Sequence, residues 1–393
     1  MKHLRIAPAV GALLALAACN SDRTTEPVMA DRAAASLSRG ASNDSDNDAD
    51  DNEGVVFTLS NQAAGNAVLA FSRHADGSLT ADGSYPTGGN GSGGGLGSQN
   101  AVVYSPDGKL LFAVNAGSNT VTAFRVHDDK LTLASTMASG GTHPISVTAS
   151  HGLLYVLNDG GSGNIAGLRY ASDGTLSTIT GSSRALSAAG SGPAEVQFTQ
   201  KGDRVIVSEK NANMLATYSI DDDGLAGAGL FTPSAGQTPF GFVTRDDEII
   251  ISEAAGGAAN ASSASSYEVG RTGAPSVITA SAATTETSAC WVAVTGNGRY
   301  AYTANTSSGT ISGFAVSKGG ALTLLDANGE TAVFGAGTAP ADLAVSHNSQ
   351  FLYSRNGGAR SIGVARIHGD GSLTVLAGGI SGLPAGTVGL AAR

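Results

Sequence analysis

The sequence has few charged residues, few aromatic residues and almost no cysteine. Charged residues make up 14% of its 393 residues, aromatic residues 5%, and only two cysteines are present. Two cysteines exclude a disulfide-rich secreted scaffold. The low charge excludes long coiled coils, which are rich in Glu, Lys and Arg, and the eleven prolines exclude a proline-rich chain.

Glycine is abundant instead. The chain has 55 glycines, which follow no collagen-like triplet, and 41% of its residues are hydrophobic, enough to build a core. A chain that is rich in glycine, poor in proline and weakly charged is typical of many short strands joined by tight turns. We therefore expect an all-β protein.

The first residues have the pattern of an export signal. A basic start is followed by the apolar stretch Ile6–Leu16, which is too short to span a bilayer. The ending Leu16-Ala17-Ala18-Cys19 resembles the lipobox of bacterial lipoproteins. This resemblance implies cleavage of a signal peptide (1–18), lipid on Cys19 and anchoring in the bacterial cell envelope, on the periplasmic or outer surface. The alternative is an ordinary signal peptide with a chance cysteine.

Residues 19–53 form an acidic segment without apolar periodicity, with six acids between positions 44 and 53. The spacing of its first three aspartates is that of a calcium loop, but Ala49 and Val55 stand where such a loop needs Gly and Glu. We therefore interpret the segment as a solvated, disordered tether. The net charge of −10 and the lack of a basic stripe exclude a nucleic-acid partner.

The rest of the chain repeats about every 49 residues. Each copy has an apolar strand that ends at Asn or Glu, followed by a loop and a second strand with alternating side chains. The seven strand ends fall at Asn61, Asn115, Asn158, Glu209, Glu253, Asn305 and Asn356. Tight Asp-Gly turns recur between the strands, as at Asp107-Gly108, which indicates four strands in each unit.

The two ends of the repeat region complement each other. The first copy lacks its first strand, and Leu383–Leu390 resembles the strand that is missing. The sequence therefore predicts a seven-bladed β-propeller over residues 54–393, with four antiparallel strands per blade and the C-terminal strand closing the ring. An open β-solenoid, the alternative, would not need a split repeat. We expect a monomer, which touches the membrane through its lipid anchor only.

Four short motifs indicate a family. They are Ser105–Lys109, Thr142–Pro144, Ser191–Glu195 and Ser208–Lys210. With these motifs the repeat region resembles the seven-bladed lactonase-type propellers, which include 6-phosphogluconolactonases and carboxymuconate cyclases. The resemblance implies a small lactone or sugar-like ligand, and the opening or formation of a lactone ring without a cofactor or metal.

The catalytic pattern of that family is only partly present. His-Pro-His is represented by His143-Pro144-Ile145, Arg and His of the next motif are replaced by Ala194 and Glu195, and Glu209 retains a carboxylate. The resemblance therefore makes Glu209, Glu195 and His143 the candidate catalytic residues. Lactone chemistry needs an acid or base and positive charge near the oxyanion.

Each of these three residues also has a structural interpretation. Glu195 and Glu209 in one cleft would form a like-charge pair with one raised pKa, suited to a neutral substrate, or would be hydrogen-bonded structural carboxylates. His143 is either a base or a turn residue.

Four more residues are candidates for substrate binding. Trp291 and Asp342 occupy the position two residues after the start of a blade, which lies near the channel mouth of a propeller. Trp291 would stack on a sugar ring or plug the channel. Lys210 and Arg355 are cations close to strand ends, and both could equally be solvated side chains. Two segments are rich in small residues. We interpret 88–97 as a flexible loop, and 254–266 as either a disordered insertion or an adaptable rim loop.

Two functional hypotheses remain open. The first is an exported, lipid-anchored lactonase-family propeller that hydrolyses or forms a lactone ring. The second is a non-catalytic propeller that binds a ligand or a protein and has lost the Arg/His site of the family.

Overall fold

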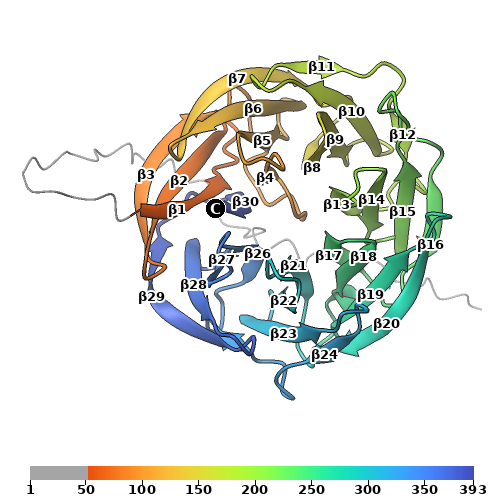
Figure 1. The fold of residues 1–393 in the computed structure, drawn as a ribbon. Helices are drawn as coiled ribbons and strands as arrows, with labels where there is room; N and C mark the ends of the chain where they lie inside the picture. The colour runs from red at the N-terminus through yellow and green to blue at the C-terminus, as the bar shows by residue number, and fades with distance from the viewer. Residues whose placement is uncertain (1–51) are drawn as a thin grey trace, which may run out of the picture.

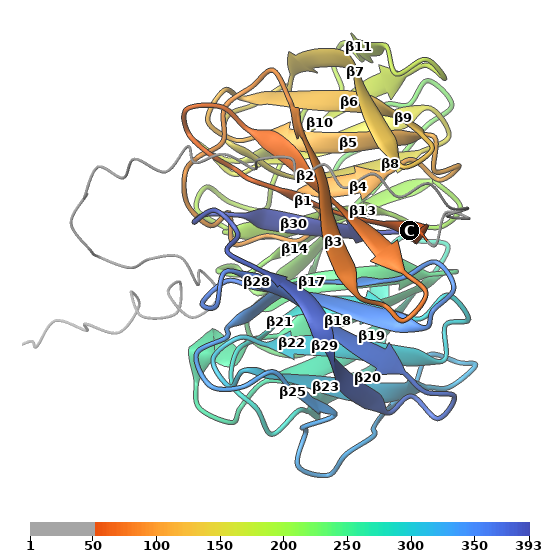
Figure 2. The ribbon, with the colours of Figure 1, turned by 90° about the vertical axis from the view of Figure 1, so that its left-hand side faces the viewer.

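The computed structural model describes residues 52–393 as seven antiparallel β-sheets arranged around a central channel (Figure 1). The signal peptide, the lipidation of Cys19 and nearly all of the tether lie outside the described residues. Figure 2 views the disc from its edge. None of the described segments forms a helix long and apolar enough to cross a membrane.

Each blade runs from an innermost strand at the channel to an outermost strand at the rim of the disc. From the channel outward, blade 1 contains β30 (Val388–Ala392), β1 (Asn52–Leu59), β2 (Ala67–His74) and β3 (Leu79–Pro86), and blade 2 contains β4 (Val102–Tyr104), β5 (Leu110–Asn115), β6 (Thr120–His127) and β7 (Lys130–Ala138). Blade 3 contains β8 (Pro144–Ser150), β9 (Leu153–Asn158), β10 (Asn164–Tyr170) and an outer strand split into β11 (Leu176–Thr178) and β12 (Arg184–Ala185). Blade 4 contains β13 (Pro193–Phe198), β14 (Arg204–Glu209), β15 (Met214–Ser219) and β16 (Leu230–Pro233).

Blades 5 to 7 follow the same order. Blade 5 contains β17 (Pro239–Arg245), β18 (Glu248–Glu253), β19 (Ser263–Val269) and β20 (Pro275–Ala283). Blade 6 contains β21 (Ala289–Val294), β22 (Tyr300–Asn305), β23 (Thr310–Val316) and an outer strand split into β24 (Leu322–Leu324) and β25 (Ala332–Val333). Blade 7 contains β26 (Pro340–Val345), β27 (Phe351–Asn356), β28 (Ser361–Ile367) and β29 (Leu373–Ser381). One short 3-10 helix, η1 (Ala255–Gly257), follows β18.

Because the strands of a blade alternate in direction, their connections fall on two faces of the disc. We call the face that carries the start of each innermost strand and the turn between the second and third strands the upper face. The lower face carries the other two turns of each blade. The start of β13 and the end of β14 thus lie together at the upper face, because Pro193 pairs with Glu209.

The ring closes as the sequence predicted. The C-terminal strand β30 pairs with β1, with Phe57 opposite Ala391, and completes blade 1 (Figure 1). The Thr58 hydroxyl donates to the carbonyl of Gly389 at 2.6 Å, and the backbone N–H of Arg393 donates to the carbonyl of Val55 at 2.9 Å. The first blade is therefore built from both ends of the described chain.

The second strand of most blades is buried on both faces. All six residues of β5, of β9 and of β27 are buried. The alternating exposure expected from the sequence is also absent from β6, where Thr122 is as buried as its apolar neighbours. The reason is that each blade is covered by a blade on either side, so that both faces of its inner strands lie in the core.

Tyrosines tie neighbouring blades to the predicted Asp-Gly turns. The hydroxyl of Tyr302 on β22 donates to the carbonyl of Gly371 at 2.9 Å, and that of Tyr353 on β27 donates to Gly77 at 3.1 Å. The latter bond joins blade 7 to blade 1. Both glycines have φ near +85°, which a side chain would strain.

The two segments rich in small residues are parts of the blades. In the segment 88–97, Gly91 donates to the carbonyl of Gln62 at 2.9 Å and Gly93 to that of Asn61 at 2.8 Å. A Cβ on Gly91 would lie 2.1 Å from the backbone of Asn61, so this glycine allows close approach rather than flexibility. The other segment is not a disordered insertion, because β19 begins at Ser263 and completes blade 5.

Candidate functional site

The upper part of the channel is filled by three residues from blade 2. Ser98, Gln99 and Asn100 precede β4, and the chain there runs toward the middle of the ring (Figure 1). The Ser98 hydroxyl donates to the Ile145 carbonyl at 2.7 Å, and the Gln99 N–H donates to the Ala194 carbonyl at 3.1 Å. These contacts bind Ser98–Asn100, which we call the plug segment, to the innermost strands of blades 3 and 4.

The amide of Gln99 reaches across to blades 5 and 6. Its Oε1 accepts from the N–H of Val292 at 2.9 Å, and its Nε2 donates to the carbonyl of Val292 at 3.0 Å. Gly241 stands two residues after the start of β17 and leaves room for the Gln99 side chain, since a Cβ on Gly241 would lie 2.2 Å from Gln99 Oε1. The plug segment is thus fitted to its channel.

Glu195 lies beneath the plug segment. Its side chain is completely buried, with Oε1 accepting from Asn100 Nδ2 and Oε2 from the N–H of Phe242, both at 2.6 Å. Burial raises the pKa of Glu195 well above its usual value, the nearby charge of Asp342 raises it further, and the Phe242 hydrogen bond opposes the shift. The carboxyl therefore fastens the plug segment between blades 2, 4 and 5.

Asp342 is sealed in the same channel. It is 2% exposed, has φ of 93°, and its Oδ1 accepts from the N–H of Leu343 at 3.0 Å, whereas its buried Oδ2 has no hydrogen-bond partner among residues 52–393. Burial raises the pKa of Asp342 to about 7, against the opposing charge of Arg355 on the next strand. The acid that raises the pKa of Glu195 is thus Asp342, and Glu209 does not contribute.

Trp291 borders the plug segment. It is 2% exposed, its Nε1 donates to the carbonyl of Ser98 at 2.9 Å, and its ring lies 4.8 Å from the ring of Phe240. In this arrangement the indole is buried and holds the plug segment in place.

Glu209 occupies the strand-end position of the repeat. Its buried carboxylate accepts from the N–H of Ser187 at 3.1 Å and from the hydroxyl of the same serine. Glu253, at the same position in blade 5, accepts from the hydroxyl of Ser265 at 2.6 Å and the N–H of Gly236 at 2.8 Å. Both carboxylates therefore tie the end of a strand to the loop that precedes the blade. Asn115, at the same position in blade 2, does the same with its amide oxygen, which accepts from the Thr87 hydroxyl.

Three polar side chains gather at the upper rim of blades 3 and 4. His143 precedes β8, Asp159 follows β9, and Lys210 follows β14. The Nδ1 atom of His143 lies 3.9 Å from Oδ1 of Asp159, and both side chains are about one-third exposed. The charge of Asp159 also acts on Lys210. We call these three residues the rim site.

The backbone holds His143 in its place. It adopts φ of 56°, its N–H donates to Asn119 Oδ1 at 2.7 Å, and its carbonyl accepts from the N–H of Asp159 at 3.0 Å. Thr238 repeats this conformation, with φ of 59° and an N–H that donates to Asn213 Oδ1 at 2.7 Å. The position is therefore a structural feature of the repeat, and the imidazole is an addition to it.

Lys210 connects the rim site to the plug segment. The residue is half-buried, and its Nζ donates to the carbonyl of Gly97 at 2.6 Å and lies 4.7 Å from the centre of the Phe240 ring. Burial lowers its pKa to about 8, with the charge of Asp159 acting in the opposite direction. A cavity of about 210 Å³ adjoins the rim site, lined by Asp159, Ser191, Pro193 and Asn211 among others.

The structure thus separates the seven predicted residues into groups. His143 and Lys210 reach the rim site, Glu195, Trp291, Asp342 and Arg355 lie in or beside the closed channel, and Glu209 lies in a blade junction. Sequence reasoning missed Asp159 and the plug segment. Within residues 52–393, no group of three or more His, Cys, Asp or Glu side chains is arranged to hold a metal ion.

Comparison with known proteins agrees with the fold. Residues 64–183 and 297–379, just over half of the chain, match the family model described as "Lactonase, 7-bladed beta-propeller". The match omits residues 184–296, the part that contains Ala194, Glu195 and Glu209. Ala194 and Glu195 thus lie between the matched stretches, whereas His143-Pro144-Ile145 lies within the first of them.

Solved structures show the same architecture. A putative 6-phosphogluconolactonase from Bacteroides fragilis has a TM-score of 0.64 at 17% identity, over 88% of this chain and 99% of its own. The periplasmic gluconolactonase of Pseudomonas aeruginosa also has a TM-score of 0.64, at 16% identity, over 85% of this chain and 98% of its own. At such identities the likeness establishes the fold alone. A search among curated proteins found no match.

Proposed function

The chain belongs to the seven-bladed β-propeller lactonase family, and we propose that it is an exported hydrolase that opens a neutral sugar lactone at the rim site. One observation carries the proposal. His143 Nδ1 lies 3.9 Å from the Asp159 carboxylate, the charge of Asp159 acts on the ammonium group of Lys210, and Asp159 lines a cavity at the upper face. The other predicted acids are enclosed by protein.

The rim site has the groups that lactone hydrolysis needs. Asp159, near Nδ1, would hold a proton on that nitrogen and leave Nε2 of His143 free to accept a proton from water. The water oxygen bonds to the lactone carbonyl carbon, and the ring C–O bond then breaks as the ring oxygen takes up the proton. One product, a hydroxy acid, results. Lys210 uses one donor on Gly97 and retains two for the developing oxyanion.

A neutral substrate suits the charges of the rim site. The negative charge of Asp159 acts on the one ammonium group of the rim site, that of Lys210, so that little net positive charge remains for a phosphorylated sugar. The names of the structural relatives include both a gluconolactonase and putative 6-phosphogluconolactonases. We therefore favour an unphosphorylated aldonolactone, which agrees with a protein exported from the cytoplasm.

The proposal is tested by measuring hydrolysis of glucono-δ-lactone and its 6-phosphate with the purified protein, with the spontaneous rate subtracted. We expect turnover of the neutral lactone, and a loss of about 10²- to 10⁴-fold in kcat/KM for His143→Gln. His151→Gln, at a lower-face turn where Nδ1 lies 2.9 Å from the Ser150 hydroxyl, is the matched control and should retain full activity. Absence of turnover with any lactone would exclude the proposal.

Anchoring is a separate part of the proposal. The sequence Leu16-Ala17-Ala18-Cys19 supports lipid attachment at Cys19 and a location in the cell envelope. Cys19→Ser should move the protein from the membrane fraction to the soluble fraction. If the variant stays with the membrane, the lipid anchor is rejected, whatever the result of the lactone assay.

A non-catalytic binding propeller is the second candidate. The observation that favours it is that the carboxyl groups of Glu195 and Glu209 are both occupied by internal hydrogen bonds. In that case gluconate or its lactone would bind at the rim site, detectable by calorimetry, without being converted. His143→Gln and Lys210→Met would then weaken binding in a protein that shows no turnover.

A further inference from the structure

A larger cavity opens on the lower face, away from the rim site. Its volume is about 700 Å³, and it lies between the turns of blades 5 and 6. Val243, Val294 and Val316 contribute apolar surface, and polar residues of the two turns surround them. The volume is in the range of small-molecule sites, and most of the residues that line the cavity are polar.

Arg245 forms a fixed wall of this lower cavity. Its Nε donates to Glu248 Oε2 at 2.8 Å, and two other nitrogens donate to the carbonyls of Gly298 at 2.7 Å and Ser317 at 3.0 Å. Its side chain is 18% exposed. Because Arg245 joins blade 5 to two turns of blade 6, the shape of the cavity is set before any ligand arrives.

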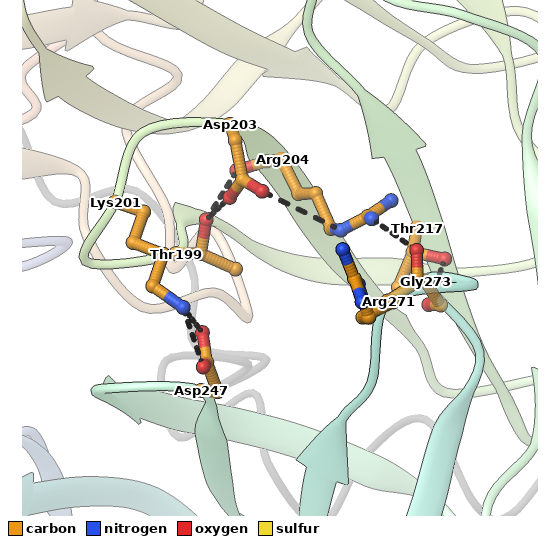
Figure 3. A network of polar contacts seen from close by, with 8 residues as sticks. All are labelled: Thr199, Lys201, Asp203, Arg204, Thr217, Asp247, Arg271 and Gly273. Atoms are coloured by element: carbon orange, nitrogen blue, oxygen red, sulfur yellow. Dashed lines mark hydrogen bonds and ion pairs between the residues drawn. The ribbon is translucent and has the colours of Figure 1, made fainter.

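The neighbouring cavity on the lower face provides a contrast. It has about 230 Å³, lies between blades 4 and 5, and two of its three cations are paired, as Figure 3 shows. Lys201 Nζ lies 2.6 Å from Asp247 Oδ2, and Arg204 Nε lies 3.9 Å from Asp203 Oδ2. Arg204 also donates to the carbonyl of Arg271 at 2.8 Å. Among the ion pairs of residues 52–393, these leave Arg271 as the one cation of this cavity without a carboxylate partner.

The larger cavity has cations that lack such partners. Among the ion pairs of residues 52–393, none involves Arg299 or Lys318, which are both exposed at the cavity rim. Arg299 lies 5.5 Å from the ring of Tyr300, a contact that leaves its hydrogen-bond donors free. The acid of this cavity, Asp246, has its N–H fixed by Gln200 at 2.9 Å, and its charge acts on Lys201 of the smaller cavity.

We propose that the lower cavity binds an organic anion. Its apolar body rests on the three valines, and its anionic group is bound by Arg299 and Lys318. The apolar surface favours a ligand with a ring or a short hydrocarbon portion over a bare inorganic ion. The two cations require a carboxylate, sulfonate or phosphate ester at one end. This site lies on the face opposite the rim site and does not depend on lactone turnover.

The probe for this proposal is 8-anilinonaphthalene-1-sulfonate, which has an aromatic body and one anionic group. Titrated into the full-length protein, it should bind saturably with one site per chain, and Arg299→Glu combined with Lys318→Glu should raise its Kd at least tenfold. Lys109→Glu combined with Arg125→Glu is the control, because it makes the same charge change at exposed cations near the lower end of blade 2. This control should leave the Kd within about twofold.

Several results would overturn the proposal. These are a lack of saturable binding, an unchanged Kd in the Arg299/Lys318 variant, or an equal loss in the Lys109/Arg125 control. The neutral analogue N-phenyl-1-naphthylamine should bind at least tenfold more weakly than the sulfonate. Equal binding of the two dyes would show that the anionic group does not contribute to binding, and this would reject the proposal. Thermal melting of each variant shows whether the fold is retained.

Discussion

The closed channel and the rim site are built from nearby positions of the same repeat, yet they differ in what can reach them. His143 stands one residue before a blade-opening proline, and Glu195 stands two residues after another. Three residues of extended chain correspond to roughly 10 Å of depth. At the rim, His143 is about one-third exposed, whereas Glu195 is completely buried beneath the plug segment. The same repeat thus provides a structural residue at one depth and an accessible residue at another.

The largest expected effect tests the structural role of the channel. Glu195→Ala would leave Asn100 Nδ2 and the Phe242 N–H without acceptors and create a cavity, so we expect the free energy of unfolding to fall by about 3 kcal/mol or more. Chemical denaturation measures the loss. His143→Gln should change it by less than about 0.5 kcal/mol. A Glu195→Ala protein with native stability but no lactone turnover would instead make Glu195 a residue that supports the reaction, with no structural role.

A smaller effect is expected at the blade junctions. Glu209→Gln should cost about 1–2 kcal/mol of unfolding free energy, because Ser187 donates to both carboxylate oxygens and an amide can accept on one only. Glu253→Gln is a matched variant at the same repeat position and should cost a similar amount. We expect both variants to retain lactone turnover. Selective loss of turnover in Glu209→Gln would make Glu209 a catalytic residue and extend the functional region inward.

The smallest effect concerns the pH dependence of the rim site. Burial disfavours the charged form of Lys210 and lowers its pKa to about 8, so the ammonium group, and with it kcat/KM, should decline as the pH rises through that value. In Lys210→Arg the side chain stays charged, and the decline should move beyond pH ~10, with less than about a tenfold change in rate near neutrality.

Lys201→Arg is the control for that experiment, because Lys201 is paired with Asp247 on the lower face. Its pH profile should match that of the native protein. An alkaline decline that is the same in Lys210→Arg as in the native enzyme would show that Lys210 does not support the reaction.

The fold could be predicted from the sequence because its signals are local and recur. Each signal involves only a few neighbouring residues: the strand ends at Asn or Glu, the Asp-Gly turns and the split first repeat. All of these signals agree with the seven sheets and with the pairing of β30 with β1. Even the depth of Glu195 and Trp291 in the channel follows from their repeat position.

The site was less predictable because it depends on contacts between blades. The plug segment comes from blade 2 but bonds to blades 3 to 6, and Gly241, which leaves room for Gln99, was one hint of it in the sequence. Blade 2 also lacks the proline that opens most of the other blades, and the amides Gln99 and Asn100 stand just before its short innermost strand. Asp159 was overlooked because its partner His143 is sixteen positions away and no motif joins the two.

The pairing of β30 with β1 also bears on the order in which the protein folds. Thr58 bonds to Val388, a residue 330 positions further along the chain. A chain that emerges from its N-terminus can form blades 2 to 7 in sequence, but β1 keeps an unpaired edge until the last strand arrives. Joining such distant segments costs little more entropy than joining nearer ones, since that cost grows only with the logarithm of loop length. Until β30 pairs with it, β1 therefore offers an open edge to other chains.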